Sequence, residues 1–184
     1  MSPLALTGTP GTGKTTLAKM LGKPLVRLSD YYEACSDGRD KGGEWLVDLE
    51  RLAQAVERDA GPESVIEGHL AHRLGLCETV AVLRCHPEEL QERLTGRDYT
   101  EAKMRENLEA EAMGIITTEA LETEAEVHEL DTTGQPVATS ATELESILAG
   151  GKSYPPGQID FSEAILGLLA KKYITLLLIP TRPN

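Results

Sequence analysis

The stretch LALTGTPGTGKTT, residues 4–16, decides the fold. Its apolar start predicts a buried strand, and residues 13–22 have the character of a helix that ends at a glycine. Between them, Gly8–Thr15 match the pattern G-x-x-x-x-G-K-[ST] in its required setting of strand, loop and helix. Glycines let the backbone N–H groups turn towards phosphate oxygens, and the helix N-terminus adds positive charge. The stretch therefore predicts a binding site for a nucleoside triphosphate.

Two side chains of this loop carry specific chemistry. Lys14 is expected to place its charge near the β- and γ-phosphates, and the Thr15 hydroxyl is a suitable ligand for Mg²⁺. The sequence therefore predicts ATP and Mg²⁺ at this loop.

Composition limits the classes of protein to consider. A length of 184 residues favours a single domain. The formal net charge of −12 argues against direct binding to nucleic acid or to an anionic membrane. The charge suits a basic protein partner, and equally a plain soluble surface. Three cysteines without a C-x-x-C pair indicate a reducing cytosol and no zinc site. We expect a cytoplasmic protein, since no signal peptide precedes the loop and no run could span a membrane.

Apolar runs alternate with helical patterns along the chain, which predicts a central parallel sheet with helices on both faces. The expected strands are 4–7, 24–28, 64–66, 79–83 and 127–130; the expected helices are 13–22, 31–34, 44–60, 87–95, 100–125 and 141–148, and residues 36–43 are expected to form a loop. Ligands bind beyond the carboxyl ends of such strands, where Gly8, Glu67 and Arg84 fall.

The end of the strand near residue 66 carries further candidates. Glu67 is expected to hold Mg²⁺ through water, and His69 to orient a water molecule or an acceptor. A strand-end turn with a solvated histidine is the alternative for His69. His72 and His86 have no comparable setting and are expected at the surface.

Two more stretches suggest a closing kinase site. Arg97 in the Gly96–Tyr99 loop could fold over a bound triphosphate as part of a short lid at about 96–106, or be a solvated arginine in a helix–helix turn. The segment at about 29–50 could close on an acceptor, with Asp30 as a contact, or be a surface loop.

Together, several motifs resemble one family. They are T-G-T-P-G-T-G-K-T-T at residues 7–16, E-G-H-L at 67–70, R-L-x-x-R-D-Y-x-E-x-K-x-x-E-N-x-E-A-E at 93–111 and Y-P-P-G-Q-I-D at 154–160. Over about residues 3–160 the chain resembles the archaeal adenylate kinase family related to adenylate kinase isoenzyme 6. The block at 93–111 is the most specific of these motifs.

The resemblance implies a single three-layer α/β/α P-loop domain with a helical insert for the nucleoside monophosphate. It implies a broad-specificity nucleoside monophosphate kinase that works best with AMP, an accompanying ATPase activity, and a role in maturing the small ribosomal subunit by transient binding of a basic ribosomal protein. Carried over by position, ATP is bound by Gly11, Gly13, Lys14, Thr15 and Thr16, Arg97 is the lid arginine, and Glu67 and His69 form the strand end. Eukaryotic relatives carry Asp at the position of Glu67, so the longer Glu67 side chain reaches further towards the metal.

Alternatives remain open at this point. A small-molecule kinase of the shikimate or gluconate type would share the loop and lid, and an ATPase assembly factor would use hydrolysis to move a partner. A pure nucleotide-binding scaffold is disfavoured because Lys14, Thr15 and Arg97 are all present. The tail at about 161–184 ends in the apolar run Ile174–Ile179, which departs from the family and leaves the oligomeric state open.

Overall fold

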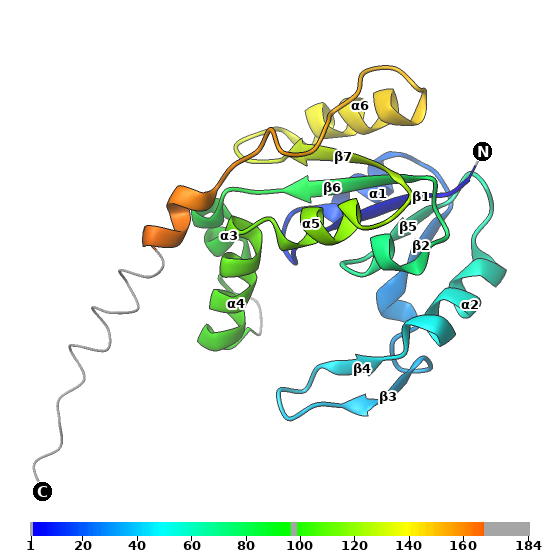
Figure 1. Cartoon of the computed structure of the whole chain (residues 1–184), viewed down its shortest axis with the longest axis horizontal. Coiled ribbons are helices and arrows are strands. Elements are labelled where there is room, and N and C mark those ends of the chain that lie inside the picture. Colours follow the sequence, from blue (N-terminus) through cyan, green and yellow to red (C-terminus); the bar gives the residue numbers. More distant parts are fainter. Residues whose placement is uncertain (1, 97–98, 168–184) are drawn as a thin grey trace, which may run out of the picture.

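A computed structural model describes residues 2–96 and 99–167 of the chain. Its centre is a five-stranded parallel sheet with the strand order β2-β5-β1-β6-β7 (Figure 1). The strands are β1 (Leu4–Gly8), β2 (Leu25–Arg27), β5 (Val65–Glu67), β6 (Thr79–Arg84) and β7 (Glu126–Asp131). The predicted central parallel sheet is confirmed.

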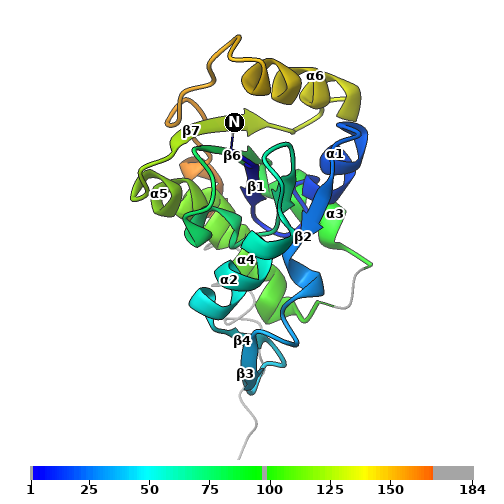
Figure 2. The same cartoon turned by 90° about the vertical axis from the view of Figure 1, so that its right-hand side faces the viewer.

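Helices cover both faces of this sheet, as Figures 1 and 2 show. On one face lie α1 (Lys14–Met20) and α6 (Val137–Leu148); on the other lie α2 (Leu49–Asp59), α5 (Ile115–Leu121) and the 3₁₀ helix η2 (Ala71–Leu74). Within the described residues, no helix is long and apolar enough to cross a bilayer.

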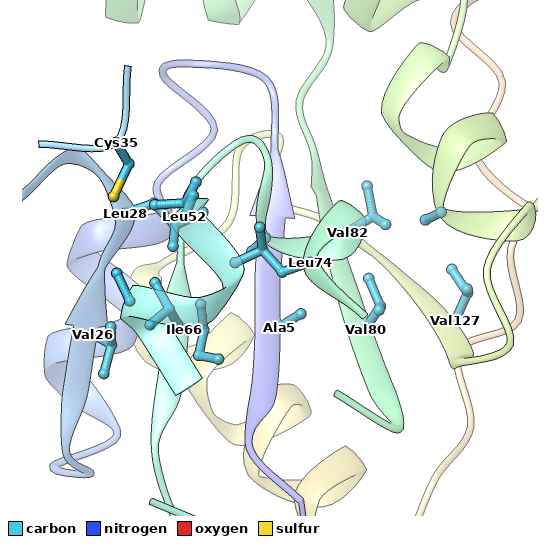
Figure 3. Packing of buried hydrophobic residues seen from close by; sticks show 14 residues of the cluster. Ala5, Val26, Leu28, Cys35, Leu52, Ile66, Leu74, Val80, Val82 and Val127 are labelled. Atoms are coloured by element: carbon cyan, nitrogen blue, oxygen red, sulfur yellow. The ribbon is translucent and has the colours of Figure 1, made fainter. Parts of the chain in front are cut away.

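The two cores follow from the alternation of side chains along the strands. Ala5 belongs to the cluster under α2, drawn in Figure 3, whereas its neighbours Leu4 and Leu6 belong to the cluster under α1 and α6. A strand covered on both faces must be apolar at every position, which explains the unbroken apolar runs of the sequence. The three-layer α/β/α arrangement is thereby confirmed.

The strand register brings the candidate residues together. Leu6 of β1 pairs with Glu67 of β5, and Gly8 pairs with Leu83 of β6. The carboxyl ends of three neighbouring strands therefore meet beside the phosphate-binding loop.

The segment at 29–50 differs from its prediction. The chain makes the 3₁₀ helix η1 (Leu28–Asp30) and then an antiparallel hairpin of β3 (Ser36–Arg39) and β4 (Trp45–Val47), which projects beside α2 (Figures 1 and 2). The expected helix at 31–34 and a helix start at residue 44 are therefore wrong. The loop expected at 36–43 is confirmed only for residues 40–43, because residues 36–39 form β3. Asp48 starts α2 because its side chain accepts hydrogen bonds from the amides of Glu50 and Arg51, both at 3.0 Å.

The predicted helix at 100–125 is also wrong, because it is two helices. After α3 (Pro87–Leu94), α4 (Glu101–Ala112) ends before Gly114, whose φ of +63° interrupts the helix and starts α5. Gly114 lies against the guanidinium of Arg84, where an added Cβ would stand 3.4 Å from a nitrogen of that group.

Arg84 is a structural residue rather than part of the strand-end site. Its guanidinium is buried and donates to Glu111 at 2.8 Å and to Glu129 at 2.6 Å. The Glu111 carboxylate also accepts from the amide of Cys85 at 3.0 Å. This ion-pair network joins the end of α4 to strands β6 and β7.

Candidate active site

The phosphate-binding loop is held in shape by its own side chains. The Nζ atom of Lys14 donates to the carbonyl oxygens of Gly8 at 2.7 Å and Thr9 at 3.0 Å, and Lys14 is only 8% exposed. The Thr12 hydroxyl donates to the same Thr9 carbonyl at 2.9 Å. The ammonium group is thus held at the centre of the loop, which lies at the start of α1.

Thr15 and Glu67 lie in direct contact across the site. The Thr15 hydroxyl donates to Oε1 of Glu67 at 3.1 Å, so two oxygen ligands are next to each other beside the loop. Mg²⁺ prefers oxygen ligands and usually keeps several waters, and this pair fits that preference. No group of three His, Cys, Asp or Glu side chains suited to a metal occurs in the described part of the chain. A bound ion would therefore take most of its remaining ligands from nucleotide and water, and would neutralise phosphate charge.

His69 follows Glu67 and faces the open part of the site. Its Nδ1 atom lies 3.3 Å from the Tyr32 hydroxyl, and the two rings meet edge to face with centroids 5.9 Å apart. Loss of hydration among the surrounding atoms, followed by the charge of Lys14, lowers the pKa of His69 to about 4. His69 is therefore neutral near pH 7, and one of its ring nitrogens can accept a proton or a hydrogen bond.

Two clefts open into each other at this point. The smaller, about 310 Å³, is lined by Lys14, Thr15 and Glu67 among others. The larger, about 940 Å³, runs between the β3–β4 hairpin and α4. The two clefts have four lining residues in common, which are Pro10, Tyr32, His69 and Tyr99. A group in the larger cleft can therefore approach a phosphate held in the smaller one.

A third cleft of about 350 Å³ lies on the other side of the loop. It is lined by Gly13 and Thr16 of the loop region and by Arg93, Thr132 and Gln135. Arg93 is oriented by hydrogen bonds to the hydroxyl of Thr132 at 3.0 Å and to its carbonyl at 2.7 Å. This cleft can take the nucleoside of a triphosphate whose phosphates lie on the loop.

An ion pair crosses the larger cleft. Lys103 of α4 meets Glu44 of the hairpin at 2.5 Å and Glu106 of its own helix at 3.1 Å. This partly exposed contact joins the two walls of the cleft.

The structure gathers most of the site residues predicted from the sequence. Gly11, Gly13, Lys14, Thr15 and Thr16 lie in the loop and at the start of α1, with Glu67 and His69 beside them; each of these seven residues lines at least one of the three clefts. Arg97 lies outside the described residues, as does the apolar run at Ile174–Ile179. Asp30 pairs with Arg27 at 2.7 Å and lines neither of the two connected clefts.

One prediction about a neighbouring histidine is wrong. His72 is buried rather than at the surface: its Nδ1 atom lies 3.0 Å from the Thr7 hydroxyl, and its Nε2 atom lies 3.1 Å from Glu119. It supports the strand that leads into the loop. The sequence reasoning also missed Tyr32 and Asn107 in the clefts, although Asn107 belongs to the motif at 93–111.

One family model and several proteins named as adenylate kinases match most of this chain. Residues 4–114 match a family model described as an AAA domain. A protein named "Putative adenylate kinase" from Methanothermobacter thermautotrophicus is 43% identical over 171 residues, covering 89% of this chain and 99% of its own length. Proteins of the same name from Thermococcus gammatolerans (41% identical; 87% and 93% covered) and Archaeoglobus fulgidus (40%; 86% and 90%) are similarly close.

Solved structures agree with this chain in fold. A shikimate kinase from Acinetobacter baumannii, solved with shikimate, aligns with a TM-score of 0.59 at 14% identity, covering 82% of this chain and 94% of that one. A sugar kinase from Janibacter aligns with a TM-score of 0.56 at 19% identity, covering 81% and 95%. At these identities the likeness concerns the fold alone.

Proposed function

This chain belongs to the archaeal adenylate kinase family, and from that premise we propose that it transfers the γ-phosphoryl group of ATP to AMP. The observation that carries the proposal is the junction of the two clefts at Pro10, Tyr32, His69 and Tyr99. Phosphoryl transfer requires the attacking and leaving oxygens to lie in line, with little covalent work by the protein. Two connected clefts, one at the phosphate-binding loop, suit that requirement.

Each side chain has a role in this mechanism. Lys14 neutralises charge on the β- and γ-phosphates, and Thr15 with Glu67 would hold Mg²⁺, which adds further neutralisation of the phosphates. His69 is neutral and lies beside the junction of the clefts, where it orients the phosphate end of the acceptor. Arg97, by its place in the sequence between α3 and α4, would add charge as a lid closes.

The donor nucleoside fits the third cleft. Its position on the far side of the loop separates the donor base from the acceptor, and Arg93 presents a fixed planar guanidinium to it. A planar cation of this kind stacks well on an aromatic ring. This arrangement suits the base of a nucleoside triphosphate donor such as ATP.

Hydrolysis of ATP without an acceptor is a second candidate activity. His69 could orient a water molecule in place of AMP, because it lies at the mouth of the loop cleft and can accept a hydrogen bond. The two activities would then share Lys14 and differ in their dependence on His69.

A role in maturing the small ribosomal subunit rests on the family resemblance and on the net charge of −12. A complex led by charge with a basic ribosomal protein should weaken between about 0.1 and 1 M salt, as the Debye length falls from about 10 to about 3 Å. A pull-down across that range tests it. Salt-insensitive binding, or none, would contradict the charge-led complex. A cytoplasmic location likewise stays a prediction.

An acceptor screen tests the proposed kinase activity. Purified protein, ATP and Mg²⁺ are incubated with AMP, CMP, shikimate or gluconate, and the phosphorylated products are separated and identified. We expect the largest amount of phosphorylated product from AMP and a smaller amount from CMP. Product from shikimate or gluconate alone would instead place the chain with small-molecule kinases.

A further inference from the structure

Asn107 presents a buried amide that the protein does not satisfy. The residue, on α4, is 7% exposed, and its Nδ2 atom has no hydrogen-bond partner in the described structure. Buried polar atoms are nearly always paired, because an unpaired donor loses its hydration without compensation. Because Asn107 also lines the larger cleft, a turn of its side chain would bring this amide to a ligand there that supplies the missing partner.

The position of Asn107 in the larger cleft indicates which part of a ligand it would meet. The phosphate end of an acceptor must lie at the junction with the loop cleft, near His69. Away from the junction, the walls include Val47, Leu49, Leu70 and Ile116, which are apolar, and Asn107 lies among the lining residues that the loop cleft does not share. These apolar walls, beside an uncharged amide, suit a flat base better than a phosphate.

Several carboxylates of this cleft already have partners. Glu44 pairs with Lys103, and Asp37 pairs with Arg51 at 2.9 Å. Asp48 caps α2. Asn107 is thus better placed than these carboxylates to select a neutral ligand group.

We propose that Asn107 reads the base of the acceptor nucleotide, pairing with an edge that offers a hydrogen-bond donor beside an acceptor. Adenine presents such an edge in its 6-amino group and the adjacent ring nitrogen, and an amide side chain matches it in a bidentate manner. This inference rests on the proposed function of the cleft as the acceptor site. Asn107 is accordingly a specificity residue, and the phosphates are handled elsewhere.

The test removes one group from the protein and one from the ligand. Asn107→Leu keeps the size of the side chain and removes the amide; purine riboside 5′-monophosphate is AMP without its 6-amino group. Wild-type protein should prefer AMP by about 10- to 100-fold in kcat/KM. In Asn107→Leu the value for AMP should fall by more than the value for the analogue, so that the preference disappears, because the analogue loses only the bond to its ring nitrogen. Glu109→Gln, on the same helix but not lining the cleft, should keep the wild-type preference.

Thermal unfolding separates a specificity role from a structural one. Asn107→Leu removes an unpaired buried amide, so the free protein should unfold at the same temperature or higher, while the rise in Tm caused by AMP should shrink. Asn107→Ala, which removes the amide in a smaller side chain, should lose the same preference and serves if the leucine variant does not fold.

The outcomes also separate this inference from the proposed kinase activity. Equal loss for AMP and the analogue, or an unchanged preference, would overturn the role of Asn107 even if AMP is phosphorylated. If wild-type protein phosphorylates no nucleotide, the kinase proposal fails. Calorimetric affinities for AMP and its analogue then decide on Asn107 by the same comparison.

Discussion

Two glycines of the phosphate-binding loop offer a matched pair of substitutions. Gly11 and Gly13 have φ angles of +97° and +101°, so an alanine at either position is strained to the same degree. Their surroundings differ: a Cβ at Gly11 would stand 2.8 Å from Leu90 and 2.9 Å from Leu94, whereas a Cβ at Gly13 would meet nothing within 4 Å. Gly11→Ala should therefore be the more damaging change.

The difference in stability can be worked from these contacts. The left-handed backbone costs an L-residue about 1–2 kcal/mol at either position. Leu90 and Leu94 are fully buried, and their side-chain ends would have to shift within the core, so Gly11→Ala adds an overpacking cost of about 1–3 kcal/mol. For a chain of this size, 1 kcal/mol corresponds to about 2–4 °C in Tm. The Tm of Gly11→Ala should thus lie about 2–12 °C below that of Gly13→Ala.

Thermal unfolding without nucleotide, followed by circular dichroism, measures this difference. The comparison cancels the backbone strain and the change in the unfolded chain, since both variants replace glycine by alanine. Equal Tm values for the two variants would refute the argument that the loop is packed tightly against α3.

Further predictions concern the chemistry and its pH dependence. Lys14→Ala should lower turnover by about 10²-fold or more in a folded protein, and near-normal activity would argue against the loop as the ATP site. Arg97→Ala should reduce kcat far more than directly measured ATP affinity; an unchanged kcat would remove the lid. His69→Ala should reduce ATP hydrolysis more than transfer to AMP, whereas equal loss would indicate a general contact. Burial lowers the pKa of His72 below 6.5, so the unfolded chain binds more protons and the free energy of unfolding should fall as pH drops below about 6.5; a flat profile in denaturant titrations would contradict this.

The sheet and the loop could be predicted from the sequence because their signals are local. A strand buried on both faces reads as a continuous apolar run, and the spacing of Gly8, Gly13, Lys14 and Thr15 is short and specific. Both signals can be read from a short window of sequence, without knowledge of the rest of the fold. Glu67 was found in the same way, because it directly follows such a run.

The features that were missed depend on tertiary contacts. The run Trp45–Val47 continues smoothly into the pattern of α2, so β4 was hidden at the start of a predicted helix, and β3 lay within a predicted loop. The break at Gly114 follows from the packing of Arg84 against it, and the burial of His72 follows from contacts with Thr7 and Glu119. No short window of sequence contains both partners of such contacts.

In the proposed reaction AMP, rather than water, receives the phosphoryl group. The most direct measurement is the rate of ADP formation from Mg·ATP by wild-type protein with and without AMP, together with the fate of a labelled γ-phosphate. We expect AMP to accelerate ADP formation strongly and the label to appear in ADP. Equal rates in both conditions, with the label released as inorganic phosphate, would contradict it and identify an ATPase.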